Sequence, residues 1–282
     1  MSSGDRAGER RGELLKGAKA GMNEIESITI LGGVRKDGSP EEIAELELRM
    51  GEVTSIVGHT GSGKTMLIND VEVFANKNTP SMRTILVNGK VPLEEFREGP
   101  SKNPVAMISQ HTNFLADLPV GRFLRIHAKI RSRDGSGGSD DRIVNDVVEF
   151  ANKLTGEGIA FDCSMTELSG GQTRALLIAD AVIIGNAPVI LLDEIENAGI
   201  HRTRALELLR DYRKIFVFVT HDPRIALLSN KRVVMRGGGM WRLLRSDGSE
   251  RALSEEARRM DDYISHLRDQ LRNGESLTSV GS

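Results

Sequence analysis

The sequence is poor in several residue types, and each shortage excludes a class of protein. Cys163 is the single cysteine among 282 residues, which excludes an intrachain disulfide and a metal site built only of cysteines. Aromatic residues make up 4% of the chain, so we expect an aliphatic core. Apolar runs such as the five residues Ile215–Val219 are far below the roughly 20 that a membrane-spanning helix needs. We therefore expect a cytoplasmic protein in a reducing compartment.

Charge of one sign is also lacking. The chain has 38 Lys and Arg against 40 Asp and Glu, a formal net charge of −2. Such a balance provides no global basic field, so we expect no nucleic acid as a partner. Residues 1–24 mix Arg, Glu and Gly without an apolar stretch, which predicts a flexible arm and not a secretory signal.

What is present is an alternation of strands and helices. The hydrophobic pattern predicts strands over 25–31, 43–49, 53–57, 83–87, 105–109, 188–192, 215–219 and 231–236. Helices are predicted to end near 76 and to cover 118–133, 141–154, 171–185, 201–213 and 223–229. This order is typical of an α/β domain with a mostly parallel sheet, here over 25–236 and interrupted by a helical insertion at about 111–167. Residues 237–282 then form a C-terminal extension.

A phosphate-binding loop is predicted between the strand at 53–57 and the following helix. The sequence there is Gly58-His59-Thr60-Gly61-Ser62-Gly63-Lys64-Thr65, which matches G-x-x-x-x-G-K-[ST]. Glycines in such a loop let backbone N–H groups turn toward phosphate oxygens at the positive end of a helix. Lys64 would neutralise the β- and γ-phosphates, and the Thr65 hydroxyl would ligate Mg²⁺. We call residues 58–65 the P-loop.

Two carboxylates end the buried strand at 188–192. Asp193 would lie at the carboxyl edge of the sheet beside the P-loop, where Mg²⁺ is expected. Glu194 could accept a proton from an attacking water. A solvated acidic turn is the alternative explanation, and the P-loop upstream makes it the weaker one.

A third motif opens the helix at 171–185. Leu168-Ser169-Gly170-Gly171-Gln172, the signature segment, offers Ser169 as an N-cap and leaves amides open to an anion. A helix start explains the serine and one glycine, but not the whole five-residue string.

Together these motifs resemble the ABC ATPase family in order and spacing over about residues 25–236. The resemblance rests on the P-loop, Gln110 at the end of a strand, the signature segment, VILLDE at 189–194, and His221 in Thr220-His221-Asp222. It implies a P-loop NTPase core with an antiparallel β subdomain and a helical insertion that carries LSGGQ. It also implies an ATP hydrolase with ATP and Mg²⁺ as cofactors.

The resemblance assigns a role to each motif residue. Glu194 resembles the base that activates water, His221 the γ-phosphate sensor, and Thr65, Gln110 and Asp193 the groups near the metal. ATP would be held by the P-loop together with Met66, and by Ser169, Gly170, Gly171 and Gln172 acting from a second domain. The expected partners are a second ABC domain, as homodimer or paralogue, and a separate membrane permease subunit or a soluble client protein. With a permease, the protein would be peripheral at the inner face of the membrane.

The sequence departs from the family pattern in three places. No aromatic residue occurs from Gly32 to Glu42, where the family usually has a ring that stacks on adenine, so Val34 or Arg35 would cover the base. The stretch 195–200 lacks the usual aspartate at position 200. The run after Gln110 keeps the shape of importer-like subunits. The first two departures favour a soluble ATPase that remodels a protein or a metallocofactor partner, and the third favours a transporter subunit.

The C-terminal extension contains an amphipathic helix at about 250–273. Its apolar residues step by 3 and 4 in the manner of a coiled-coil seam: Ala257, Met260, Ile264, Leu267 and Leu271. Because two heptads are short for an autonomous coiled coil, we expect a helix that packs on its own domain. A dimerisation or partner-docking helix is the alternative.

Overall fold

The computed structural model describes residues 25–99, 102–109, 111–114, 117–131, 140–155, 158–194 and 202–246, and part of the chain between 253 and 274. Its central element is a six-stranded sheet in the order β5-β6-β7-β3-β8-β9. The strands are β5 (Val105–Ile108), β6 (Val189–Asp193), β7 (Ile215–Val219), β3 (Val53–Val57), β8 (Lys231–Arg236) and β9 (Gly239–Arg245). The first five are parallel and β9 is antiparallel. This confirms the predicted mostly parallel α/β core.

A second, antiparallel sheet of three strands packs beside the first. Its order is β2-β1-β4, with β1 (Ser27–Leu31), β2 (Glu45–Arg49) and β4 (Thr84–Val87). Leu46 and Leu48 of β2 are buried while the residues between and beside them are more exposed. That alternation fits a sheet with one face in the core. The Asn88-Gly89 turn after β4 has φ values of 50° and 71°, as a tight hairpin turn requires.

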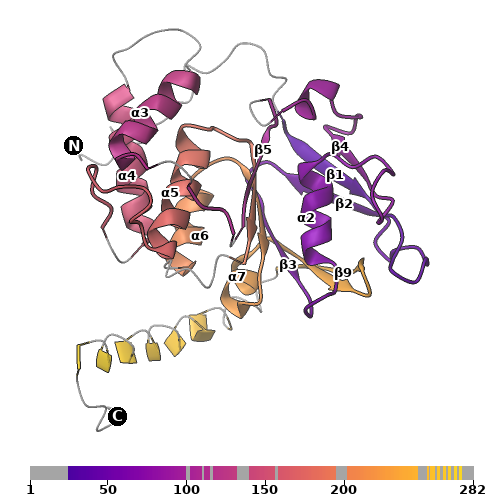
Figure 1. Ribbon diagram of the computed structural model, residues 1–282. Coiled ribbons are helices and arrows are strands. Elements are labelled where there is room, and N and C mark those ends of the chain that lie inside the picture. The colour runs from indigo at the N-terminus through magenta and orange to yellow at the C-terminus, as the bar shows by residue number, and fades with distance from the viewer. Residues whose placement is uncertain are drawn as a thin grey trace, which may run out of the picture.

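Helices cover the two faces of the large sheet unequally (Figure 1). α2 (Lys64–Glu72) lies on the side of the three-stranded sheet, which also carries the short 3₁₀ helix η1 (Glu94–Phe96). The opposite side carries α3 (Val120–Arg131), α4 (Asp140–Leu154), α5 (Gly170–Ile183) and α6 (Arg202–Arg210). α7 (Pro223–Leu228) packs against β3. The helices α3 and α4 form the insertion that the sequence predicts between β5 and the signature segment.

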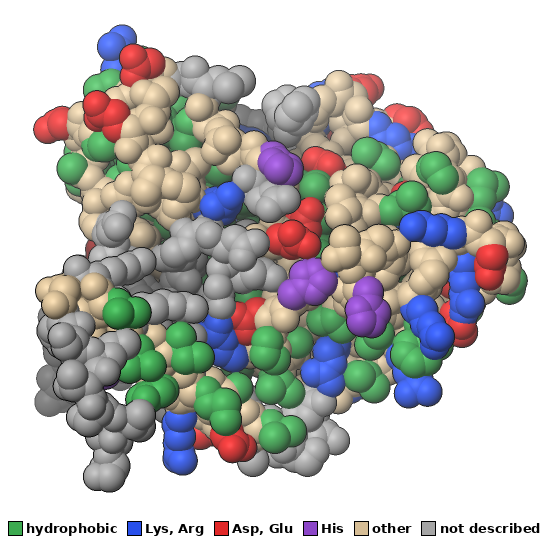
Figure 2. Space-filling view, turned by 60° about the horizontal axis from the view of Figure 1, so that its bottom comes forward, with side chains coloured by type: hydrophobic (Ala, Val, Ile, Leu, Met, Phe, Trp, Pro, Cys, Tyr) green, Lys and Arg blue, Asp and Glu red, His purple; other side chains and the backbone are tan. Residues whose placement is uncertain are grey.

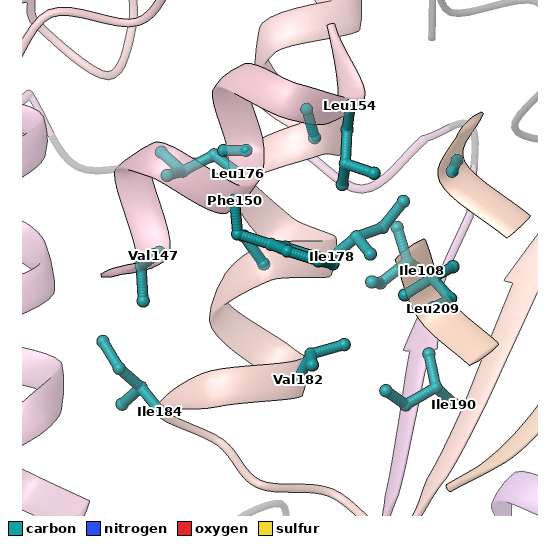
Figure 3. Packing of buried hydrophobic residues seen from close by; sticks show 14 of the residues in the cluster. Ile108, Val147, Phe150, Leu154, Leu176, Ile178, Val182, Ile184, Ile190 and Leu209 are labelled. Atoms are coloured by element: carbon teal, nitrogen blue, oxygen red, sulfur yellow. The ribbon is translucent and has the colours of Figure 1, made fainter. Parts of the chain in front are cut away.

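The sheet separates two aliphatic cores. Along β6, Ile190 and Leu192 point into the core shared with α4 and α5, while Val189 and Leu191 point into the core shared with α2. Because both faces are covered, every one of these residues is buried and β6 is a continuous apolar run. Phe150 of α4, Ile178 of α5 and Leu209 of α6 meet in the first core (Figure 3).

The structure differs from the sequence prediction at two element ends and in the packing of the C-terminal extension. The sheet continues past Arg236, because β9 pairs with β8 and Met240 is fully buried. α2 ends at Glu72, since Phe74 takes a left-handed conformation with φ 49°. In the C-terminal extension, the side chains of Met260, Ile264 and Leu271 are 59%, 45% and 60% exposed, so the predicted packing of this seam on its own domain is wrong at these residues. Within the described ranges, no helix combines the length and apolar character required to cross a membrane.

Candidate nucleotide-binding site

The strand register gathers the motifs at one edge of the large sheet. Asp193 of β6 lies opposite Val219 of β7, and Val219 lies opposite Ile56 of β3. The next backbone groups continue this row, because Glu194 N–H donates to Val219 O at 3.0 Å and Thr220 N–H donates to Ile56 O at 3.1 Å. The parallel sheet therefore brings together three motifs that lie far apart in the chain, as the sequence predicts.

The P-loop connects β3 to α2 through backbone that only glycine accommodates well. Gly63, the N-cap of α2, has φ 100°. A Cβ atom on Gly63 would lie 3.0 Å from Cα and O of Gly238 in the β8–β9 turn. Both the backbone conformation and this close approach therefore require glycine. The Ser62 hydroxyl is buried in the same loop and has no hydrogen-bond partner among the described residues. A phosphate oxygen would satisfy such a donor, so the loop fits an anionic ligand.

Lys64 lies at the centre of the site and is 6% exposed. Its ammonium donates to Gly58 O at 3.0 Å and His59 O at 3.3 Å, and Nζ lies 3.1 Å from His221 Nε2. An ammonium has no acceptor, so Nε2 must accept this hydrogen bond and the imidazole then carries its proton on Nδ1. The contact links the P-loop directly to the segment after β7.

Glu194 follows β6 in a strained conformation. Its φ of 51° lies in the left-handed region, which is unfavourable for a residue with a side chain. Glu194 Oε1 lies 3.6 Å from His221 Nε2, which is too far for a hydrogen bond. The side chains of Glu194 and His221 are 32% and 48% exposed, so solvent reaches both. Strain of this kind is common where a functional group must point away from its own strand.

His221 is fixed by the residues that follow it. Asp222 N-caps α7, its carboxylate accepting from Arg224 N–H at 2.9 Å, and Arg224 Nη2 donates to Asp222 Oδ2 at 2.5 Å. Asp222 N–H donates to the Thr220 hydroxyl at 2.8 Å. This buried hydrogen-bond set holds the short connection from β7 to α7, so His221 projects from a rigid base.

The signature segment forms the capped N-terminus of α5. Ser169 Oγ accepts from Gln172 N–H at 3.3 Å, and Gln172 Oε1 accepts from Ser169 N–H at 2.9 Å, which is a capping box. Gln172 Nε2 also donates to Gly158 O at 3.0 Å. The expected N-cap role of Ser169 is confirmed. α5 packs on the opposite face of the sheet from α2 (Figure 1). Ser169 and Gly170 are exposed, so the start of α5 is open to solvent.

The residues expected near Mg²⁺ supply suitable donors. Thr65, in the first turn of α2, has an exposed side chain, and Asp193 ends β6 at the same sheet edge. A hydroxyl and a carboxylate are hard oxygen ligands of the kind Mg²⁺ takes, with phosphate oxygens and waters for the rest. In the part of the chain that the structure describes, no three His, Cys, Asp or Glu residues form a metal-binding group. Gln110 and the stretch 195–200 lie outside the described residues.

Two features of the site were not predicted from the sequence. The β8–β9 turn packs on the P-loop, where Gly238 N–H donates to Ser62 O at 3.0 Å. Lys36 Nζ donates to Gly61 O at 2.8 Å. The triplet Gly237-Gly238-Gly239 after the strand at 231–236 is a turn signal that would have indicated this turn. Lys36 carries no comparable sequence signal.

The surface carries no large field of one sign on the face shown in Figure 2. Acidic, basic and hydrophobic side chains are interspersed there, and histidines gather near the middle beside acidic side chains. This distribution agrees with the near-zero net charge.

Comparison with known proteins identifies the family. The family model described as "ABC transporter" matches residues 42–197. An uncharacterized ABC transporter ATP-binding protein of Methanocaldococcus jannaschii is 47% identical over 255 residues, covering 90% of this chain and 96% of that protein. The macrolide export ATP-binding/permease protein MacB of Campylobacter jejuni is 30% identical over 204 residues, which are 68% of this chain and 30% of that protein.

A solved structure shares the fold. The dimeric structure of a post-hydrolysis state of an ATP-binding cassette bound to ADP and Pi superposes with a TM-score of 0.60 at 21% identity, covering 78% of this chain and 99% of that one. With the P-loop, the paired carboxylates and the signature segment in place, this chain is an ABC-type ATPase and belongs to the ABC transporter family.

Proposed function

We propose that this protein binds Mg-ATP between two head-to-tail copies of its ATPase domain and hydrolyses it to drive conformational work, as the ATP-binding subunit of a transporter-like complex. The observation that carries the proposal is that the chain has both a P-loop and a signature segment, and that the exposed Ser169 and Gly170 present the capped start of α5 to solvent. An exposed helix start of this kind can contact the nucleotide that the P-loop of a second domain holds.

Each side chain at the sheet edge has a defined part in this mechanism. The P-loop amides, the Ser62 hydroxyl and Lys64 would bind the phosphates. Thr65, Asp193 and Gln110 would hold Mg²⁺. The metal would offset the negative charge of the phosphates, which otherwise repels an attacking water. Glu194 would orient that water and take its proton, and His221 would contact the γ-phosphate from its rigid base. Ser169 and Gly171 of the second domain would contact the same phosphates.

The substitution Glu194→Gln tests this function most directly. It keeps the size and hydrogen bonding of the side chain but removes the base, so we expect ATP binding to persist and hydrolysis to fall by about 10²–10⁴-fold. The trapped ATP should also shift the protein to a dimer, measured by light scattering. Glu45→Gln, an exposed carboxylate at the end of β2, is the matched control and should leave hydrolysis unchanged. Full hydrolysis in Glu194→Gln would remove the base assignment.

The name of one relative, the ATP-binding/permease protein MacB, supports a permease as the partner, and the match covers 30% of that protein. We infer a membrane permease on a separate chain. The missing aromatic between Gly32 and Glu42 supports the second candidate, a soluble ATPase that remodels a protein or metallocofactor partner. Purification of the native protein from solubilised membranes and from cytosol separates the two, because co-purification with a polytopic membrane protein would exclude the second.

A further inference from the structure

A small hairpin over residues 34–40 occupies the place where an adenine-stacking ring is missing. Val34 bridges Pro40, Arg35 N–H donates to Ser39 O at 2.8 Å, and Gly38 N–H donates to Arg35 O at 3.0 Å. At its tip, the Asp37 carboxylate accepts from the Ser39 hydroxyl and backbone N–H, which lowers the pKa of Asp37. The hairpin is therefore an ordered element, not a loose connection.

This hairpin is docked on the β8–β9 turn that also supports the P-loop. Lys36 N–H donates to Gly237 O at 3.0 Å. A Cβ atom on Gly238 would lie 2.7 Å from Lys36 Cγ, so the lysine stem packs directly on this glycine. Below the hairpin, Glu41 is buried and bonded to Arg83 and to Met240 N–H. The position of Lys36 is thus fixed from both sides.

From this position the Lys36 ammonium reaches the P-loop. Nζ donates to Gly61 O at 2.8 Å, while the side chain is otherwise exposed. Two of its three N–H donors therefore remain for solvent or a ligand. Gly61 lies within the P-loop, so this contact places the Lys36 charge beside the backbone that is expected to surround the phosphates.

Two neighbouring side chains that could stack on a base, Arg35 and Trp241, already contact other groups. Arg35 is ion-paired with Glu42. The Trp241 ring has the guanidinium groups of Arg236 and Arg242 at 5.1 Å and 4.5 Å from its centroid. The interpretation of Arg35 as a cover for the base is therefore disfavoured by its ion pair.

We propose that Lys36 determines nucleotide affinity by acting on the phosphate chain, and that the site reads the phosphates and not the base. The inference rests on the proposed ATP site. A cation contributes equally whatever base is attached, so ATP and GTP should bind with similar affinity. Loss of the Lys36 charge should weaken the binding of ATP and of GTP to the same extent. It should weaken the binding of nucleotides with fewer phosphates to a lesser extent.

The experiment measures binding of ATP, GTP, ADP and AMP to the purified full chain at two salt concentrations. For the unaltered protein we expect the ATP and GTP dissociation constants to agree within about threefold. Lys36→Met should weaken ATP and GTP alike by about three- to tenfold and should reduce the salt dependence of binding. Lys36→Arg should restore most of the affinity because it keeps the charge.

Three controls make the result decisive. Lys90→Met removes an exposed lysine from the β4 turn and should leave binding unchanged. Trp241→Leu should not change the ratio of ATP to GTP affinity. The melting temperature of Lys36→Met without nucleotide should match that of the unaltered protein, which separates a binding role from a structural one.

Several outcomes would overturn the inference. Unchanged ATP affinity in Lys36→Met, a selectivity for ATP over GTP above about 30-fold in the unaltered chain, or a selective loss of ATP binding in Trp241→Leu would each do so. If the unaltered chain bound no nucleotide, the proposed function would fail first and this inference with it. Normal ATP binding with a silent Lys36 would overturn only the inference.

Discussion

The P-loop at 58–65 and the signature segment at 168–172 both lead into helices, yet they are held in opposite ways. The P-loop is shaped by contacts from elsewhere in the fold: the β8–β9 turn packs on Gly63, and Lys36 reaches Gly61 O. The signature segment is shaped by its own side chains through the capping box of Ser169 and Gln172. The conformation of the P-loop therefore depends on residues that are distant in the sequence. The conformation of the signature segment depends mainly on hydrogen bonds between its own residues.

The two sides of the large sheet also differ in the interactions that hold their cores together. On the P-loop side, the fully buried Arg83 donates to Glu41 at 2.5 Å and to Asp70 at 2.7 Å, and so ties the 34–40 hairpin to α2. On the signature side, α4 and α5 meet through aliphatic residues and Phe150 (Figure 3). Buried ion pairs fix geometry at a cost in desolvation, so the P-loop side should be the more sensitive to loss of a single charge.

The largest effect should come from Arg83→Met. This change leaves Glu41 and Asp70 buried without their cation, so we expect the free energy of unfolding to fall by about 3–5 kcal/mol. Denaturant titration measures it. Adding Asp70→Asn to Arg83→Met should recover part of the loss, because one uncompensated charge is then removed. A loss below about 1 kcal/mol for Arg83→Met would contradict the importance of this network.

Gly63→Ala compared with Gly170→Ala should separate the two segments. In the P-loop the added methyl group meets backbone of Gly238 at positive φ, so stability should fall by about 1–3 kcal/mol and nucleotide binding by tenfold or more. In the signature helix, Gly170 would meet only the end of the Arg174 side chain at 3.4 Å, and stability should stay within about 0.5 kcal/mol. Thermal melts and ATP titrations of both variants check this. Equal losses of stability and ATP binding in the two variants would contradict the proposed difference between the P-loop and the signature segment.

The buried Lys214, on the same side of the sheet as the signature segment, should make the free energy of unfolding depend on pH. Its ammonium is buried and donates to Asn186 Oδ1 and Ala187 O, two neutral oxygens, and burial lowers its pKa to about 8. Because the unfolded value is near 10.5, the folded state holds fewer protons between these pH values, and its stability contribution should rise with pH there. Relative to Lys214→Met, the unaltered protein should gain about 1–2 kcal/mol from pH 8 to 9.5. A pH-independent difference between the two would disprove this account.

The smallest effect should come from Ser169→Ala. Loss of the N-cap should reduce the free energy of unfolding by about 1 kcal/mol, measured by denaturant titration. In the proposed head-to-tail arrangement the segment acts on the nucleotide of the second domain, so ATP binding to the isolated chain should not change, while hydrolysis by the dimer should slow. Reduced single-chain affinity for ATP would show that the segment does not act from a second domain.

Local patterns predicted much of this molecule. β3, β6 and β7 are apolar runs bounded by turn residues, so their place in a buried parallel sheet could be predicted, as could the P-loop after β3 and the N-cap at Ser169. β9 was missed because Met240-Trp241-Arg242 shows no clear alternation, and the strand is stabilised by its pairing with β8. The helix after the P-loop was predicted too long, since Phe74 leaves helical geometry to pack in the core beside Phe96.

The sequence by itself determined the chemistry of this protein: which residues can bind phosphate, ligate a metal or accept a proton, and the order in which strands and helices carry them. That information is local, because motif spacing and hydrophobic period are properties of neighbouring residues. Only the tertiary structure decided that Lys64 meets His221, that Arg83 joins two carboxylates, and that Lys36 reaches the P-loop. These contacts join residues that are 13 to 157 positions apart. They depend on strand order and on which face of the sheet each helix covers.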